Sequence, residues 1–222
     1  MYRYISGKDT NELMIAFSRV DTGPRTSFGD GFLDALDVTQ LYRYISGRDP
    51  KTPAGGPTTR SQPLGNTASV GSSSVQVKSA SPAKARMAVA STRTLQVAST
   101  AGTAGASVSI PVTLEAQGDE NSVSFSLGFD ASLLSFTSIS LGSGAQGRIL
   151  TTNLNELTSG RLGVLVSHGT DSDTFGVGVK ELVVANFSIN GSAPATTTSL
   201  QLVNSPIQTR VADTNASPAS FA

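Results

Sequence analysis

From residue 108 onward, apolar residues recur at every second position in one short segment after another. The alternating sets are Val108, Ile110, Val112 and Leu114; Val123, Phe125, Leu127 and Phe129; Leu134 and Phe136; Ile139 and Leu141; Leu162, Val164 and Val166; Val183, Ala185, Phe187 and Ile189; and Leu200 and Leu202. A period of two is the side-chain repeat of a β-strand, and clusters of Gly, Asn, Asp and Ser separate the segments. Several short strands with one apolar face each predict a β-sandwich. The phase slips between Phe136 and Ile139, which predicts a β-bulge.

Composition divides the chain into three zones. Residues 1–49 hold most of the helical signal, residues 50–86 are rich in Pro, Gly, Ser, Thr and Ala, and residues 87–222 carry the alternation. The middle zone has too few large apolar residues to bury a core, so it is predicted to be a linker. Residues 74–78 alternate within it and are predicted to form a short strand that a sheet can take up.

The overall composition excludes several classes of protein. There is no cysteine, which excludes disulfides and thiolate metal sites. Sixteen basic and sixteen acidic residues leave no basic excess for a nucleic-acid partner. No apolar run is long enough for a transmembrane helix. The first seven residues lack the apolar stretch of a signal peptide, so a secreted protein of this sequence is expected to be processed or partial.

An eight-residue segment occurs twice. Residues 2–9 read YRYISGKD and residues 42–49 read YRYISGRD. This duplication predicts a repeated helical unit, of which the chain begins within the first copy. A further helix is predicted near residues 11–19, where apolar residues fall on one face.

The second copy is expected to end a helix that runs from Asp34 to Ser46. Asp34 suits the N-cap position and Gly47 suits the left-handed position just past the helix end. The predicted apolar face of this helix consists of Val38, Leu41, Tyr42 and Ile45.

The loop before this helix gives the sharpest chemical signal. An EF-hand loop binds calcium through acids at its fifth and twelfth positions, with glycine at the sixth, and Asp30, Asp37 and Gly31 keep that spacing. Asp34 then takes the ninth position and the carbonyl of Phe32 the seventh. Calcium is therefore the expected ion.

The front of the loop departs from the EF-hand pattern. In this register the first and third positions are Thr26 and Phe28, and phenylalanine cannot ligate a metal. An insertion of residues 22–29 would allow Asp21 to supply the first carboxylate. The candidate calcium ligands are thus Asp21, Asp30, Phe32, Asp34 and Asp37. The alternative is a capped helix with solvated aspartates.

Residues 1–49 resemble dockerin, whose duplicated units each pair a calcium loop with a helix. The resemblance rests on Gly29-Asp30-Gly31, on the helix that ends at Gly47 and on the repeat. Dockerins bind cohesins through these helices. The resemblance therefore implies that Leu41, Tyr42, Arg43 and Ile45 form either a partner-facing surface or a core face, and both alternatives stay open.

The zone from residue 87 onward resembles a cohesin domain. Residues 100–112 contain a glycine turn that leads into a Val-x-Ile-Pro-Val strand, and residues 125–136 contain a Phe-Asp-x-x-Leu-Leu step. The fold class that this implies is mainly β: a jelly-roll sandwich with a small N-terminal helical module. Related carbohydrate-binding sandwiches share these patterns. Residues 215–221 are expected to lead into a last strand, and without it an open sheet edge would be left for another strand to fill.

The sequence carries no enzyme signature, and we predict that the protein is not an enzyme. His168 is the only histidine and is expected to be solvated at a strand end. Asp119 and Glu120 are expected to be solvated in a turn. Asp171 and Asp173 remain open as a second calcium site. Nucleophile-elbow, Walker and dinucleotide motifs do not occur in the chain.

These features together predict an extracellular structural protein of bacterial type. A dockerin-like module and a cohesin-like module on one chain allow each copy to dock on the next. Such head-to-tail contacts generate a filament or tube, with donated strands as a further possibility. The expected partners are other copies of the chain. The alternatives are a scaffold or adhesin module that binds other secreted proteins or polysaccharide, and an accessory domain of an enzyme. Docking within one chain would instead give a monomer.

Overall fold

The computed structural model describes residues 1–8, 19–53, 55–57 and 93–221. The predicted strand at residues 74–78 lies outside the described residues, and so does all of the predicted helix near residues 11–19 except its last residue.

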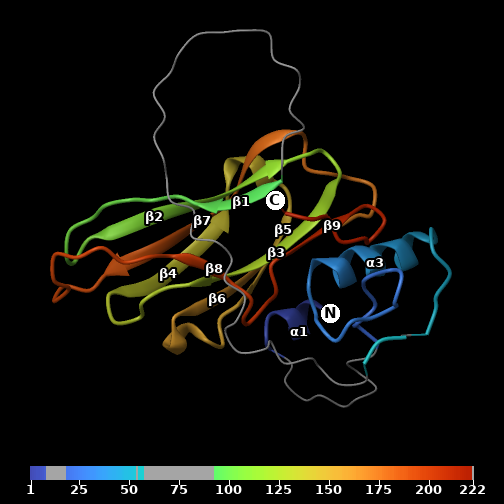
Figure 1. The fold of residues 1–222 in the computed structure, drawn as a ribbon, viewed down its shortest axis with the longest axis horizontal. Coiled ribbons are helices and arrows are strands. Elements are labelled where there is room, and N and C mark those ends of the chain that lie inside the picture. The colour runs from blue at the N-terminus through green and yellow to red at the C-terminus, as the bar shows by residue number, and fades with distance from the viewer. Residues whose placement is uncertain (9–18, 54, 58–92, 222) are drawn as a thin grey trace, which may run out of the picture.

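Two antiparallel sheets pack face to face in the described part of the chain (Figure 1). The first sheet has the order β1 (Thr94–Val97), β2 (Ser107–Ala116), β7 (Gly178–Ile189) and β4 (Leu134–Leu141). The second has the order β5 (Ile149–Asn153), β6 (Arg161–Ser167), β3 (Glu120–Gly128) and β8 (Gln201–Val203), and β9 (Arg210–Asp213) pairs with the first half of β3. Short 3-10 turns, η1 (Ser143–Ala145) and η2 (Leu157–Ser159), lie in the connections. The predicted mainly β sandwich is confirmed.

The period-two alternation produces the core between the sheets. Val123, Phe125 and Leu127 of β3 are fully buried there, as the sequence pattern requires. The pairing of β4 with β7 shifts register between Phe136 and Ser138, so the predicted bulge is confirmed.

A helical module, the described part of residues 1–57, contains α1 (Tyr2–Ile5) and α3 (Ala35–Ser46). The Oδ1 atom of Asp34 accepts a hydrogen bond from the backbone N–H of Leu36 at 2.9 Å, and Gly47 closes the helix with a φ of 77°. Both predicted helix caps are therefore confirmed. Within the described residues, no helix combines the length and the apolar character that crossing a membrane requires.

The helical module lies against the outer face of the second sheet, beside β3, β6 and β9 (Figure 1). A second apolar cluster joins the two parts: Ile5, Leu33, Ala35, Leu36 and Val38 from the module, and Leu165, Ile207 and Ala212 from the sandwich. All of these side chains are buried, so the module and the sandwich share a continuous interior.

Candidate docking face and acidic loop

The outer face of β3 is lined by serines. Ser122, Ser124 and Ser126 alternate with the core residues of the same strand and are completely buried under the segments that cover the sheet. The hydroxyl of Ser126 donates to the carbonyl of Ile207 at 2.7 Å. Because buried hydroxyls need hydrogen-bond partners, these serines require covering segments that supply donors and acceptors.

The stripe of α3 that faces these serines is also small and polar. Ala35, Thr39 and Arg43 are spaced by four residues and therefore share one face of the helix. Ser122 Oγ donates to the carbonyl of Ala35 at 2.9 Å and lies 2.7 Å from Thr39 Oγ1. The backbone N–H of Ala35 donates to Ser124 Oγ at 3.3 Å. We call Ala35, Thr39 and Arg43 of α3, together with Ser122, Ser124 and Ser126 of β3, the docking face.

Arg43 anchors the end of this stripe. It is 6% exposed and binds Asp49 through two parallel bonds, Nε to Oδ2 at 2.7 Å and Nη2 to Oδ1 at 2.9 Å. Its Nη1 donates to the backbone carbonyl of Thr214 in the sandwich at 2.7 Å. The hydrogen bond from Arg43 lowers the pKa of Asp49 to about 2, so the pair is ionised near neutral pH.

The C-terminal end of α3 makes a second polar contact with the sandwich. Ser46 Oγ donates to Asp171 Oδ2 at 2.7 Å, and the Arg48 Nε atom lies 3.1 Å from the same oxygen. Asp173, by contrast, accepts a hydrogen bond from Thr170. Asp171, which the sequence leaves open as a second calcium ligand, is thus engaged with the helical module.

The first copy of the repeat also contacts the second sheet. The hydroxyls of Tyr2 and Tyr42 are hydrogen-bonded, and Tyr2 lies 3.2 Å from Ser167 Oγ. The carbonyl of Ile5 accepts a bond from Asn153 Nδ2 at 3.0 Å. Both copies of the repeated segment therefore touch the same face of the sandwich.

The four candidate partner residues separate in the structure. Arg43 and Tyr42 lie on the side of α3 that contacts the sandwich and α1, and Leu41 is half-buried. Ile45 is 70% exposed, although Ile5, its equivalent in the first copy, is fully buried. Ile45 therefore belongs neither to the core nor to the docking face.

The acidic loop brings Asp21 next to the start of the EF-hand-like segment. Asp21 Oδ1 accepts from the backbone N–H of Asp30 at 3.0 Å, and Oδ2 accepts from that of Gly31 at 2.8 Å. Gly31 has a φ of 87°, a conformation that favours glycine. Residues 22–29 form an excursion with its own turn, in which the N–H of Phe28 donates to the carbonyl of Pro24.

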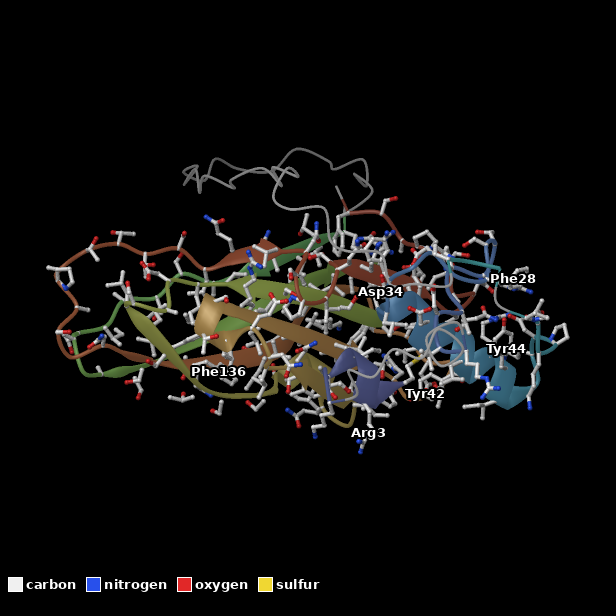
Figure 2. All side chains as sticks on the ribbon, turned by 90° about the horizontal axis from the view of Figure 1, so that it is seen from below. Arg3, Phe28, Asp34, Tyr42, Tyr44 and Phe136 are labelled. Carbon is white, nitrogen blue, oxygen red and sulfur yellow. The ribbon has the colours of Figure 1, made fainter. Side chains whose placement is uncertain are left out.

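Asp37 closes the other end of the loop. Its Oδ1 accepts from the backbone N–H groups of Thr22 and Gly23 at 2.7 and 2.8 Å, and its Oδ2 accepts from that of Asp34 at 2.9 Å. In Figure 2, Asp34 lies close to the sandwich strands, whereas Phe28 and Tyr44 lie farther from these strands.

Burial and mutual repulsion raise the pKa values of these carboxylates above that of an ordinary aspartate. Burial raises the pKa of Asp21 to about 6 and that of Asp34 to about 7, and it raises the pKa of Asp37 well above its usual range. Repulsion from Asp30 adds to the shifts of Asp21 and Asp34. The loop therefore needs a positive charge or protons to be stable near neutral pH.

The ligand chemistry of the loop fits a hard cation, but its present arrangement does not form a metal site. Asp34 Oδ2 is buried and has no hydrogen-bond partner among the described residues, so either a proton or a nearby cation would stabilise it. Within that same part of the chain, however, no three Asp, Glu or His side chains are arranged to hold a metal ion. The nearby charge is Arg210, whose Nε lies 3.7 Å from this oxygen.

The expected solvation of Glu120 and His168 is wrong, whereas Asp119 is exposed as expected and binds Arg93 from the surface. Glu120 is fully buried and binds Arg93 Nε at 2.6 Å. His168 is only 8% exposed and packs edge-on against Phe175, with ring centroids 4.8 Å apart. Neither ring nitrogen of His168 has a hydrogen-bond partner among the described residues.

The buried His168 predicts a specific pH dependence. Burial lowers its pKa from 6.5 to about 4, so the unfolded chain binds the proton more tightly and stability is lost as the pH falls through this window. Between pH 7 and pH 4 the wild type is expected to lose about 2 kcal/mol more than His168→Gln. Urea denaturation of both proteins across this range measures the difference, and parallel curves would contradict it.

Comparisons with known proteins support the fold of the sandwich. No family model matches the chain, and no curated protein matches it either. The sixth cohesin of scaffoldin B from Acetivibrio cellulolyticus, solved in complex with a dockerin, is 22% identical with a TM-score of 0.53, covering 60% of this chain and 94% of that chain. A type I cohesin–dockerin complex from Clostridium thermocellum matches at 12% identity with a TM-score of 0.52, covering 59% and 93%. The sandwich of this protein therefore has the jelly-roll fold of cohesin domains.

Proposed function

We propose that this protein is an extracellular, non-enzymatic assembly module in which a dockerin-like helical module and a cohesin-like sandwich bind each other. Within one isolated chain the two parts dock on each other. Between neighbouring copies the same contact, exchanged, links chains head to tail into a filament or tube.

The observation that carries this proposal is the packing of α3 against Ser122 and Ser124 on the outer face of β3. Thr39 and Ser122 meet there at 2.7 Å, and Arg43 reaches Thr214. The contact combines hydroxyl hydrogen bonds and small side chains with an apolar cluster. Contacts of this mixed, polar character are typical of surfaces that associate reversibly.

The sequence between the two parts sets the balance between docking within a chain and docking between chains. Residues 50–86 have the composition of a flexible linker. A flexible chain of about 35 residues has an end-to-end distance of roughly 30 Å, which would give the tethered partner an effective concentration in the millimolar range. Dilute chains are therefore expected to be monomers, and exchange between copies requires chain concentrations that approach this value, as on a crowded cell surface.

We further propose that the acidic loop binds calcium, with Asp21, Asp30, Asp34, Asp37 and the carbonyl of Phe32 as ligands. The unpartnered oxygen of Asp34 and the oxygen-only donor set support this ion. Binding would require the carboxylates to turn toward a common point. In the loaded loop, calcium would supply the positive charge that these buried acids need.

Single-cysteine variants test the exchange directly, because the chain has no cysteine of its own. Thr39→Cys and Ser122→Cys chains are purified separately, mixed at increasing concentration and oxidised. Exchange predicts a disulfide-linked dimer of the two variants whose yield rises steeply toward millimolar chain. Light scattering of the wild type is expected to rise over the same range.

The control pairs Thr39→Cys with Ser140→Cys, which lies exposed on β4 of the other sheet. This pair is expected to give only the background of random collisions. Equal yields from both mixtures, or no dimer at any concentration, would contradict the exchange between copies.

A second candidate is a scaffold or adhesin module whose sandwich receives a helical module from another secreted protein. It is favoured by the comparisons, since the two similar structures described above are cohesins in complex with dockerins. This candidate predicts that the wild type stays monomeric by light scattering at all concentrations, with calcium or with a chelator. A rise in mass with concentration would contradict it.

A further inference from the structure

Arg210 is a side chain of the sandwich that points its charge at the helical module. It is the first residue of β9, and its Nη2 lies 3.8 Å from Asp30 Oδ2 while its Nε lies 3.7 Å from Asp34 Oδ2. The Nε also donates to Gln208 Oε1 at 3.1 Å, which helps to fix its position. The guanidinium therefore stands beside one carboxylate oxygen of Asp30 and one of Asp34, and the other oxygen of each accepts a backbone N–H group.

The loop itself supplies no countercharge at this point. Residues 21–37 contain four aspartates and a single basic residue, Arg25, which pairs with Asp49. Asp34 is 1% exposed, and its Oδ2 has no hydrogen-bond partner among the residues that the structure describes. A buried carboxylate in this situation is costly unless a cation is close. The proximity of Arg210 favours the ionised form of Asp34, against the effect of burial.

We propose that Arg210 is the built-in counter-cation of the acidic loop, and that a divalent cation and the docked sandwich compete for the Asp30 and Asp34 oxygens. The proposal rests on the docking described under the proposed function and adds its regulation.

Electrostatics gives the direction of this competition. A positive charge within about 4 Å of two ligand carboxylates repels a divalent cation and weakens its binding. Linkage is reciprocal, so an ion that binds the undocked loop more tightly must weaken docking by the same factor. Calcium is therefore expected to weaken docking of the module on its own sandwich and on that of a neighbouring copy alike, because Arg210 faces the loop in both contacts.

Calcium titration by isothermal calorimetry tests the competition. Arg210→Gln is expected to bind calcium about tenfold more tightly than the wild type at low ionic strength, and the difference should shrink in high salt because the interaction is screened. Arg161→Gln is the matched control: Arg161 has a similar side-chain exposure, 39% against 33%, and pairs with Glu156 instead of the loop. Arg161→Gln is expected to bind calcium as the wild type does. Arg210→Lys keeps the positive charge, so its calcium affinity should also stay close to that of the wild type.

A second readout measures docking. In a chain that carries both Thr39→Cys and Ser122→Cys, calcium should lower the fraction that forms the disulfide, and this effect should be weaker when Arg210→Gln is added. Equal or weaker calcium binding by Arg210→Gln would overturn the competition, and so would the absence of calcium binding from both proteins. In each of these cases a disulfide that still forms in chelator would leave the docking itself intact, so the two proposals fail separately.

Discussion

Arg43→Ala is expected to lower the free energy of unfolding of the helical module by about 4 kcal/mol and to release it from the sandwich. The substitution removes two charge-assisted bonds to Asp49 and leaves that buried carboxylate without its main partner. It also frees the carbonyl of Thr214, which Arg43 links to α3. Hydrogen exchange of the α3 amides and thermal denaturation measure the loss.

The repeat supplies a control for this substitution within the same chain. Arg3 occupies the equivalent position in the first copy but is exposed, so Arg3→Ala is expected to change stability by less than about 0.5 kcal/mol. Arg43→Lys keeps the charge but loses the paired geometry, and should fall between the two. Equal effects of Arg3→Ala and Arg43→Ala would show that the buried pair does not anchor the module.

Phe187→Ala is expected to destabilise the sandwich by about 4 kcal/mol, because it opens a cavity in the middle of the core. Phe187 is fully buried on β7 and packs edge-to-face against Phe129 and Phe136, with ring centroids 5.1 and 5.9 Å apart. Urea denaturation followed by circular dichroism measures the change.

Phe136→Ala provides the comparison, since this ring is only half-buried at the edge strand β4. This substitution removes one of the same ring contacts, and we expect it to lower the free energy of unfolding by about 1.5 kcal/mol. A Phe187→Ala protein that is no less stable than Phe136→Ala would contradict the assignment of Phe187 to the centre of the core.

The parts of the fold that the sequence predicts are those with strong local signals. Neighbouring residues alone determine three of these features: the strands with clear alternation, the slip after Phe136, and the caps at Asp34 and Gly47. The alternation of β1 is limited to Leu95 and Val97, and β5 and β9 have no such signal. They are short, and β5 carries the polar run Thr151-Thr152-Asn153. Their strand geometry comes from pairing with distant segments, which local pattern does not reveal.

The docking face escaped the sequence analysis for a different reason. Of the four candidate partner residues that the dockerin resemblance implies, only Arg43 belongs to the stripe Ala35, Thr39 and Arg43. Ala35 and Thr39 are small residues that carry no local sign of a contact. The serines of β3 were visible as the polar half of the alternation, yet that half is normally solvated. The burial of His168 and Glu120 cannot be predicted from local pattern either, because Phe175 and Arg93, which contact them, are not their sequence neighbours.

Disulfide trapping of the chain that carries both Thr39→Cys and Ser122→Cys tests the central claim most directly. The two native oxygens are 2.7 Å apart, so sulfurs in their place are close enough to bond. In chelator and at micromolar concentration, the account predicts a disulfide between the α3 and β3 peptides in a protein of monomeric mass. Two free thiols that both react with an alkylating reagent in the folded protein would show that α3 does not rest on the serine face of the sandwich.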